Sequence, residues 1–494
     1  MKKAALIPAL ALLGALGCAI GPDYQRPEIE VPVEYRGKVT VQEAESLADL
    51  NWWQVFEDPV LLELIKTTLE NNLDLEIAVA RTEQAYRLSI ATDSAFYPQA
   101  SYGGTAGKQR APVAVLGGAT ADFTNYAGAL NFAWEIDVWG RIRRASESAR
   151  AQLLASQDIQ RAVLLTLVSD VATLYFALIE LDDAQHIAQE AVAAFTDTLD
   201  LFTRKYEGGV ASKLEVARAA AARAQATAGL PGIAIQIAAT ENQLSVLLGR
   251  PPGEIPRGIP LAQQHLPDLP SGLPSALLER RPDIRQAEQA VVASNAQIGV
   301  ALGNFLPRVG LVAMWGGGAE GIANMASPSA SVWNLAAELT GPIFQGGLLY
   351  AQYKSQQAAW QEAKANYELT ALNAFAEVSS VLVERRLRIV QRRARETQVE
   401  QLDESVRLSL LRYNQGLANY FEVLQAQQDL YPAMFDLSKT RLEEQVSVIK
   451  LYRALGGSWQ LGLDWLPDTP AVEATGIDWP MGSAAQSPAD APAD

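Results

Sequence analysis

The sequence predicts a mixed fold of very long α-helices and amphipathic β-strands, built by internal tandem duplication. Two runs, 141–207 and 348–415, contain neither glycine nor proline, and each follows a stretch of alternating apolar and polar residues. The runs start 207 positions apart, and the residues after them match at the same offset. A single helix of 67 residues would extend about 100 Å at roughly 1.5 Å per residue. Such helices need partners along their whole length, so a coiled-coil rod and a wall of packed helices both fit.

The duplication defines two repeats, 51–250 and 275–457. Segment 206–211 (YEGGVA) matches segment 413–418 (YNQGLA), and the downstream Leu-Gly pairs keep this offset. Each repeat is expected to contain, in order, a helix, a β-hairpin, a long helix and a returning helix. The expected bounds are a hairpin at about 99–138, a long helix at 141–207 and a returning helix at 211–249, then a hairpin at about 308–343, a long helix at 348–415 and a returning helix at 418–455.

The N-terminus has the layout of a bacterial lipoprotein signal. Lys2 and Lys3 precede an apolar stretch that ends at Gly17, directly before Cys18, the one cysteine of the chain. We expect residues 1–17 to be a signal peptide, and residues 18–50 to hold the lipid anchor on Cys18 and a linker. The order Ala15-Leu16 departs from the usual lipobox, so an ordinary signal peptide with an incidental cysteine stays an alternative. No later segment reads as a transmembrane helix.

Proline-rich segments mark the remaining joints. Residues 251–274 form a linker between the repeats, and residues 458–494 form a tail whose far end is expected to be disordered. Pro231 and Pro432 fall inside the returning helices and are expected to kink or break them.

The stretch before each long run has a period of two. Tyr126, Phe132 and Trp134 alternate with polar or small residues, as do Trp333 and Leu335 in the second copy. This pattern is typical of strands with one apolar face, and the strands are long enough to cross a bilayer when tilted. A soluble β-domain with one wet face also fits the alternation.

A weaker strand precedes each of these stretches, and glycine-rich loops at 116–120 and 316–321 are expected to join them into two hairpins. Four strands cannot close a barrel in lipid, because bacterial outer-membrane barrels begin at about eight strands and open edges are not tolerated. If the hairpins enter a membrane, the protein must therefore form an oligomer.

Aromatic residues near the strand ends favour the membrane interpretation. Interfacial girdles of membrane barrels hold such residues at both ends of the strands. The barrel-interface candidates are Trp134, Trp139, Trp333 and Phe344. Glu135 and Glu338 lie on the opposite face and are expected to line water in the lumen.

Composition excludes several classes of function. The formal charge is −16, or −18 without Lys2 and Lys3, which makes nucleic-acid binding improbable. His186 and His265 are the only histidines, and neither has a metal-ligand partner at helical spacing. No phosphate-binding loop of the Walker type occurs, so we expect neither an enzyme nor a bound metal or cofactor.

Several motifs together resemble the outer-membrane factors, the TolC-like channels of tripartite efflux systems. The resemblance is to the lipoprotein branch that serves resistance-nodulation-division pumps, and it covers nearly the whole chain. It rests on segments 21–27 (GPDYQRP), 52–59 (WWQVFEDP), 134–141 (WEIDVWGR), 278–285 (LERRPDIR) and 341–347 (GPIFQGG). Their order and spacing across both copies make the set specific.

The resemblance implies an architecture and a set of partners. It implies a homotrimer whose chains contribute four strands each to a twelve-stranded β-barrel, continued into the periplasm by a twelve-helix α-barrel with an equatorial domain. It implies a periplasmic adaptor protein and an inner-membrane resistance-nodulation-division transporter as partners. The function so implied is a passive exit duct for drugs or other toxic small molecules, in the outer membrane of a Gram-negative bacterium.

Within that architecture the turns between long and returning helices would form the periplasmic aperture. Gly208, Gly209 and Gly416 would make these turns and are candidates for contact with the adaptor. Glu215 and Glu422 would gather carboxylates at a narrow mouth and favour cations.

Further aperture candidates are Arg412, Tyr413 and Asn419. Where the family often has Asp-Val-Leu-Asp, segment 422–425 reads EVLQ, which weakens the expected acidic gate. Glu215 and Glu422 also fit solvated residues that favour a helix start.

Two other functions fit parts of the pattern. A channel for secreted polypeptides would share the fold. A non-conducting periplasmic scaffold lipoprotein would use the long coiled coils but would need no amphipathic hairpins.

Overall fold

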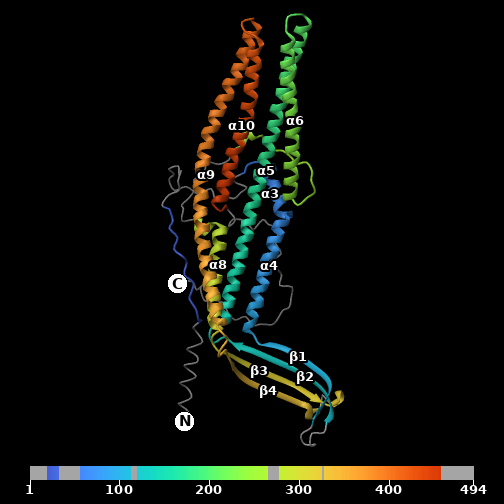
Figure 1. The fold of residues 1–494 in the computed structure, drawn as a ribbon, viewed down its shortest axis with the longest axis vertical. Helices are drawn as coiled ribbons and strands as arrows, with labels where there is room; N and C mark the ends of the chain where they lie inside the picture. Colours follow the sequence, from blue (N-terminus) through green and yellow to red (C-terminus); the bar gives the residue numbers. More distant parts are fainter. Residues whose placement is uncertain (1–18, 33–55, 113–119, 265–276, 325–326, 458–494) are drawn as a thin grey trace, which may run out of the picture.

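A long layer of helices stands over one end of a curved four-stranded sheet (Figure 1). The computed structural model describes residues 19–32, 56–112, 120–264, 277–324 and 327–457. Cys18, the signal peptide, His265 and the C-terminal tail therefore lie outside the described residues.

The two repeats have matching elements. In the first, α4 (Leu73–Asp93) leads through the short turn η2 (Ser94–Phe96) to the sheet, and α5 (Arg141–Glu207) and α6 (Lys213–Leu247) follow. In the second, α8 (Pro282–Gly303), α9 (Leu348–Asn414) and α10 (Tyr420–Ala454) take the same places. Both long helices have 67 residues, so the predicted tandem duplication is confirmed. Each repeat begins with a shorter helix, α3 (Pro59–Asn71) in the first and α7 (Leu277–Arg280) in the second.

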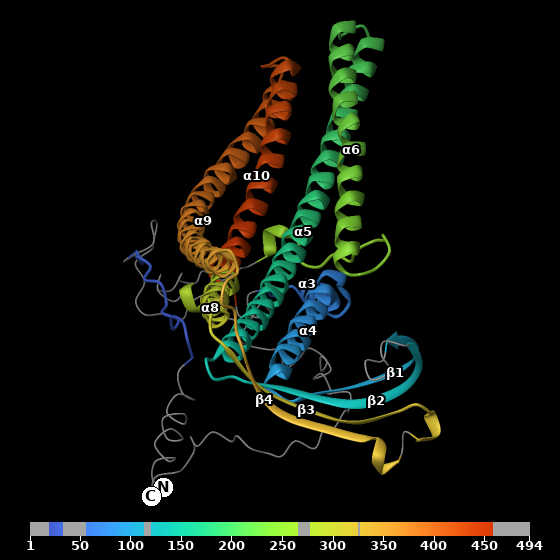
Figure 2. The same cartoon turned by 60° about the horizontal axis from the view of Figure 1, so that its bottom comes forward.

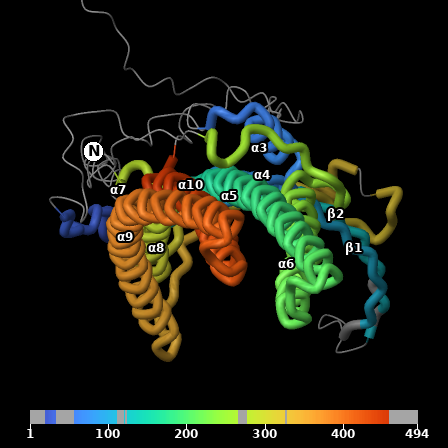
Figure 3. Tube along the Cα trace, turned by 90° about the horizontal axis from the view of Figure 1, so that it is seen from above, coloured from blue at the N-terminus to red at the C-terminus, as the bar shows by residue number. Residues whose placement is uncertain are grey.

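The helices form one row. α9 packs on α10, α10 on α5, and α5 on α6, while α4 and α8 flank α5 nearer the sheet. The view along the long axis shows this row as an arc with α6 and α9 at its two ends (Figure 3). The row of helices is therefore one curved layer, which we call the helix wall.

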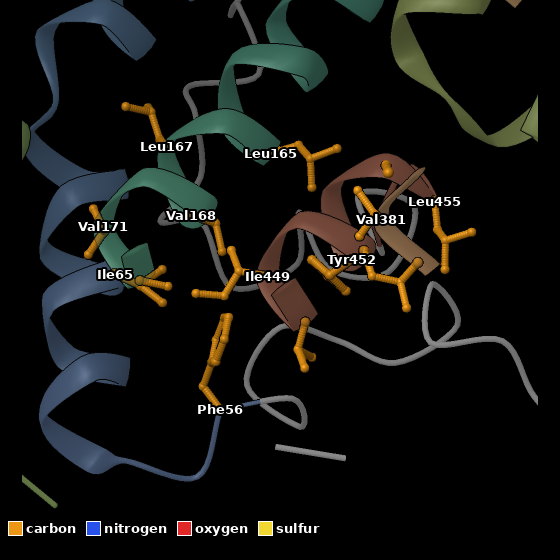
Figure 4. Close-up of a cluster of buried hydrophobic side chains, with 14 of the residues drawn as sticks. Phe56, Ile65, Leu165, Leu167, Val168, Val171, Val381, Ile449, Tyr452 and Leu455 are labelled. Atoms are coloured by element: carbon orange, nitrogen blue, oxygen red, sulfur yellow. The ribbon is translucent and has the colours of Figure 1, made fainter. Parts of the chain in front are cut away.

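The main core lies where the repeats meet, midway along the helices. Val168 and Val171 of α5 face Ile65 of α3 and Ile449 of α10, and all four side chains are buried (Figure 4). Complete burial of each aliphatic side chain contributes about 1.5–3 kcal/mol. An 18-residue window within α5 is apolar enough to cross a bilayer, with a mean hydropathy of 2.1, but 56% of it is buried in the protein. It belongs to the core of the helix wall.

Pro231 and Pro432 were expected to kink or break the returning helices, and neither proline breaks its helix. α6 continues through Pro231 and α10 continues through Pro432. Proline removes one backbone hydrogen bond, but each helix packs against a neighbouring long helix over its length. This packing offsets the local loss.

The sheet has the order β1-β2-β3-β4, and all neighbouring strands are antiparallel. Its strands are β1 (Gln99–Pro112), β2 (Thr120–Ile136), β3 (Arg308–Ala319) and β4 (Ser331–Thr340). The sheet curves away beneath the helices (Figure 2).

The predicted loop at 316–321 is partly wrong, because β3 continues to Ala319. Gly316 pairs with Ala129, and a side chain at Gly316 would place its Cβ 2.3 Å from the Gly128 carbonyl oxygen. These glycines therefore extend the strand by allowing close approach. The connection to β4 instead contains two short turns, η6 (Ile322–Asn324) and η7 (Pro328–Ala330).

The strand register separates an apolar face from a polar one. Trp134 pairs with Leu311, which pairs with Ala337, so these three side chains share one face. One position along, Glu135, Gly310 and Glu338 form a row on the other face. Among the described residues, β1 and β4 have no second neighbour and are the two open edges of the sheet.

Candidate aperture and membrane interface

Both long helices end in the same turn. Gly209 and Gly416 each have φ +73°, a left-handed conformation that glycine adopts readily. At the first tip the amide of Val210 donates to the Lys205 carbonyl, and at the second tip Leu417 donates to Arg412. These bonds satisfy the last helix carbonyls in a Schellman motif. Gly208 has an ordinary negative φ of −80°, so the turn does not require glycine there.

The returning helices start at side-chain caps. Ser212 accepts a hydrogen bond from the Glu215 amide, while the Glu215 carboxylate accepts from the Ser212 amide at 2.7 Å. The Ser212 amide and the Ser212 hydroxyl both donate to this carboxylate and lower the pKa of Glu215. Asn419 caps α10 by accepting from the Phe421 amide at 3.0 Å. Two of the predicted aperture residues therefore also define helix starts.

The second tip holds one ion pair between candidate aperture residues. Arg412 Nε lies 3.4 Å from Glu422 Oε2, with both side chains about half exposed. Exposed pairs of this kind contribute about 0.2–1 kcal/mol. The pair joins the end of α9 to the start of α10.

A cluster of aromatic side chains joins the two helix pairs just below the tips. Tyr413 accepts a hydrogen bond from Lys205 of the other pair, whose ammonium also lies 4.4 Å from the Tyr413 ring centroid. Tyr420 packs edge-on against Phe202 and Tyr413, with ring centroids 4.6 and 5.0 Å away. Its hydroxyl lies 2.6 Å from Thr198 Oγ1. We call these five residues the tip cluster.

Sequence reasoning found only Tyr413 of the tip cluster. Thr198, Lys205 and Phe202 lie on α5, whereas Tyr420 begins α10. Their spacing along each helix is that of ordinary core positions, and nothing in one sequence indicates which helices face each other.

Each tip also exposes a matching apolar pair. Val210 and Leu214 at the first tip are 78% and 61% exposed, and Leu417 and Phe421 at the second are 66% and 52% exposed. The pairs lie at equivalent positions of the repeats, in the turn and in the first turn of the returning helix.

The predicted interface aromatics lie near the sheet end that adjoins the helices or on the apolar face. Trp134 Nε1 donates to the Phe96 carbonyl at 2.9 Å, and Trp333 pairs with Trp315. Trp139 and Phe344 were expected in strands, but β2 ends at Ile136 and β4 at Thr340. Both lie in the connections to the long helices, one position out of phase with the apolar residues of the strands.

The two lumen carboxylates differ in their surroundings. Glu135 accepts two hydrogen bonds from Arg141 Nη2, at 2.8 and 2.9 Å, so the first residue of α5 neutralises it. Glu338 lies in the same row, two strands away, in an exposed part of β4. Among the described residues no group of three or more His, Cys, Asp or Glu side chains could hold a metal ion, and His186 pairs with Glu190.

Comparison with known proteins decides the family. The family model for the outer membrane efflux protein matches residues 64–250 and 273–457, and these two ranges cover most of the two repeats. The chain belongs to the outer membrane efflux protein family.

Individual members of this family match over almost their full length. The solvent efflux pump outer membrane protein SrpC of Pseudomonas putida is 32% identical over 469 residues, covering 92% of this chain and 98% of SrpC. The cation efflux system protein CusC of Escherichia coli is 30% identical over 465 residues, covering 93% of this chain and all of CusC.

Solved efflux channels have the same fold. The structure of the outer-membrane channel OprN matches with a TM-score of 0.83 and 26% identity, over 90% of this chain and all of that one. The CusC structure matches with a TM-score of 0.81 and 29% identity, over 89% of this chain and all of that one. The predicted TolC-like fold is therefore confirmed.

This protein is the outer-membrane component of an efflux system of a Gram-negative bacterium. Its family consists of efflux channels rather than enzymes. The expectation of an efflux channel is confirmed at this level.

Proposed function

We propose that three copies of this chain close into one continuous duct, lipid-anchored at Cys18, through which drugs, solvents or other toxic small molecules pass out of the cell. The energy comes from an inner-membrane resistance-nodulation-division transporter, and a periplasmic adaptor links that transporter to the helical tips. The proposal rests on the unpaired edges of two layers, the β-sheet and the row of helices.

Within the part of the chain that the structure describes, the sheet and the helix row are open on both sides. β1 and β4 are the sheet edges, and α6 and α9 end the helix row. In lipid, unpaired strand edges are costly, so β4 of one copy is expected to pair with β1 of the next. A head-to-tail contact of this kind closes into a ring.

Apolar side chains on the outer helices support the same closure. Leu387 and Val390 of α9 are 54% and 60% exposed, and Leu73 and Ile77 of α4 are 64% and 48% exposed. In a ring these two surfaces face each other. Their burial would provide the hydrophobic contribution that a single copy lacks.

The helical tips are suited to an adaptor that is itself helical at the surface that binds them. Val210 and Leu214 repeat as Leu417 and Phe421, so a ring presents alternating copies of one apolar pair around its mouth. Glycine turns at Gly209 and Gly416 leave open space beside them. An amphipathic helical hairpin could insert apolar side chains between neighbouring tips.

The position of Ile20, two residues after Cys18, supports an anchor at the membrane. Ile20 N–H donates to the Trp139 carbonyl at 2.9 Å, at the junction between sheet and helices. Cys18 precedes this contact by two residues, so acyl chains on it would enter the inner leaflet beside the barrel.

The duct proposal alone does not select a cargo class, because a passive duct needs no dedicated binding site. Relatives at similar identity are named for solvent and for cation efflux, so the family name does not separate these cargoes. We favour organic molecules because the chain has five methionines, two histidines and one cysteine in 494 residues.

The test is native mass spectrometry of the protein extracted from outer membranes, combined with planar-bilayer conductance. A lipidated trimer that conducts is expected. A monomer that does not conduct would contradict the duct and favour a scaffold. Deletion of the gene should raise sensitivity to organic solvents and drugs; sensitivity to copper or silver alone would contradict the cargo class.

A further inference from the structure

The apolar face of the sheet carries all of its charged residues at one end. By strand register, this face holds the even-numbered residues of β1 and β2 and the odd-numbered residues of β3 and β4. Among the described residues of that face, only Lys108, Arg110 and Asp122 are charged, and we call them the outer charge cluster. They lie where β1 turns into β2, at the end of the sheet away from the helices (Figure 1). In an outer-membrane channel this end faces the cell exterior.

The three side chains contact each other across β1 and β2. Arg110 lies opposite Asp122 and donates to it through Nε at 2.6 Å and Nη2 at 3.1 Å. Lys108 lies two residues earlier on the same face, and its Nζ is 3.8 Å from the same carboxylate. Lys108 and Arg110 are both 69% exposed, whereas Asp122 is 40% exposed. One carboxylate balances one cation, so the cluster has an excess positive charge that remains open to the surroundings.

The cluster lies at the depth of a membrane surface. Trp134 marks the helix end of the apolar face, and Thr124, the partner of Lys108, lies ten residues away on the same strand. Ten residues of strand extend about 33 Å at about 3.3 Å per residue. A strand tilted by about 40° rises about 25 Å over this length, which is the height of the apolar band in membrane barrels. With Trp134 at one border of the band, Lys108 and Arg110 lie at the other.

Between these two borders the face is uncharged and suited to acyl chains. Tyr102 and Leu130 are 88% and 43% exposed in neighbouring strands, and Trp315 and Trp333 continue the same row at 61% and 75%. A cation on the lipid face is costly at the middle of the bilayer and tolerated near its surface. The placement of Lys108 therefore matches the depth of lipid headgroups.

The neighbouring copy in a ring does not balance the excess charge through its edge strand. The lipid-facing residues of β4 are Ser331, Trp333, Leu335, Ala337 and Leu339, and none of them is acidic. Glu338, the acidic residue of β4, lies on the opposite face. The excess charge is thus left to an anion from outside the sheet, and phosphate groups are the anions that lipid headgroups place at this depth.

We propose that Lys108 and Arg110 bind the phosphate group of a lipid headgroup in the outer leaflet, while Asp122 holds the two cations side by side. A guanidinium and an ammonium on one face can donate several charge-assisted hydrogen bonds to a single phosphate. The inference rests on the proposed duct, because only a closed barrel places this face in lipid. A trimer has three such sites, one beside each β1.

The experiment is native mass spectrometry of the lipidated full-length protein in detergent, titrated with diphosphoryl lipid A as the probe. Replacing both cations, Lys108→Gln with Arg110→Gln, should lower the affinity for this lipid about tenfold. The matched control, Lys213→Gln with Arg223→Gln, removes the same charge at exposed positions of α6 and should bind as the parent does. Asp122→Asn keeps both cations and removes the competing carboxylate, so it should bind the lipid more tightly than the parent.

Two further titrations identify the source of the phosphate. Dephosphorylated lipid A should bind weakly, and equally to the parent and the double variant. Inorganic phosphate should not displace diphosphoryl lipid A from the parent; displacement would overturn a lipid as the ligand. Equal affinity of the parent and the double variant for diphosphoryl lipid A would overturn the site.

The charge-neutralising variant at Asp122 keeps the test decisive if the double variant does not assemble. An affinity of Asp122→Asn equal to that of the parent would then overturn the site. A monomer in the spectrum would overturn the duct, and the lipid site with it. A trimer whose lipid affinity ignores these three residues would overturn the lipid site alone, so the two failures are distinguishable.

Discussion

The hydroxyl groups of Thr198 and Tyr420 lie 2.6 Å apart and join the two long helix pairs just below the aperture turns. Both side chains are almost fully buried, at 3% and 6% exposure. Burial raises the pKa of Tyr420. The contact stays neutral over the physiological range, and it can break only if the helix pairs separate.

Tyr420→Phe should loosen the aperture while leaving the ring packing against Phe202. The lost hydrogen bond costs about 0.5–1.5 kcal/mol, and the Thr198 hydroxyl keeps its helix bond to the Ala194 carbonyl. We expect a several-fold higher closed-state conductance in planar bilayers. Tyr431→Phe, at a ring that packs on Phe195, is the matched control. Identical conductance of Tyr420→Phe and the parent would show that this contact does not restrain the tips.

Glu215→Gln with Glu422→Gln should reduce the cation preference of the channel. Glutamine can still accept the Ser212 amide, so the change removes charge with little loss of helix capping. The carboxylate of Glu215 has a lowered pKa, so its stabilising effect is present at neutral pH and is lost only as pH falls through that lowered value. Reversal potentials in a salt gradient check this; an unchanged cation preference would place the selective charges elsewhere.

Asp58→Asn should destabilise the join between the first repeat and the inter-repeat linker. Asp58 Oδ2 accepts hydrogen bonds from the Tyr175 hydroxyl, the Ile259 amide and the Gln264 side chain, all within 2.9 Å. An asparagine would either point its amide N–H groups at these donors or accept their hydrogen bonds without a negative charge. Either outcome costs about 2–4 kcal/mol. Thermal unfolding followed by circular dichroism measures it. Glu57→Gln, next to it and exposed, should leave the unfolding temperature unchanged.

Glu180→Gln should stabilise the protein at neutral pH but not in acid. Burial, with a smaller effect from Asp183, raises the pKa of Glu180 to about 6, while Lys439 of α10 opposes the shift. A carboxyl with a raised pKa destabilises the fold increasingly as pH rises from about 4.5 to about 6, and fully above that. At pH 7.5 the substitution should raise the free energy of unfolding by about 1 kcal/mol, after allowance for partial solvent exposure.

The same comparison at pH 4.5 supplies the internal check, since the gain should vanish there. Glu207→Gln, an exposed position near the end of the same helix, is the matched control. A gain of equal size at both pH values would mean that burial of charge is not the cause.

The sequence could predict individual helices and turns, but it could not predict which distant residues contact each other. The helices from Arg141 and Leu348 follow from periodic apolar residues without breakers, and the turns at Gly209 and Gly416 follow from glycine placement. The contact of Thr198 with Tyr420 joins residues 222 positions apart, and no local pattern encodes it. The same holds for the hydrogen bond from Arg26 to the Tyr367 hydroxyl.

Local signals were misleading at two positions. Pro231 is an unfavourable residue for a helix interior, yet packing on α5 holds its helix together. Trp139 lies beyond the end of β2 at Ile136, and its indole donates to the Pro307 carbonyl at 2.7 Å. In both cases tertiary contacts, rather than the residue itself, decided the structure.

The open edges of the sheet have a genetic consequence. In the proposed trimer each seam joins the last strand of one copy to the first strand of the next. A copy with one damaged edge strand therefore breaks one seam, and one broken seam opens the whole ring. When normal and damaged genes are expressed together, intact rings should fall with the cube of the normal fraction, so such alleles should be dominant.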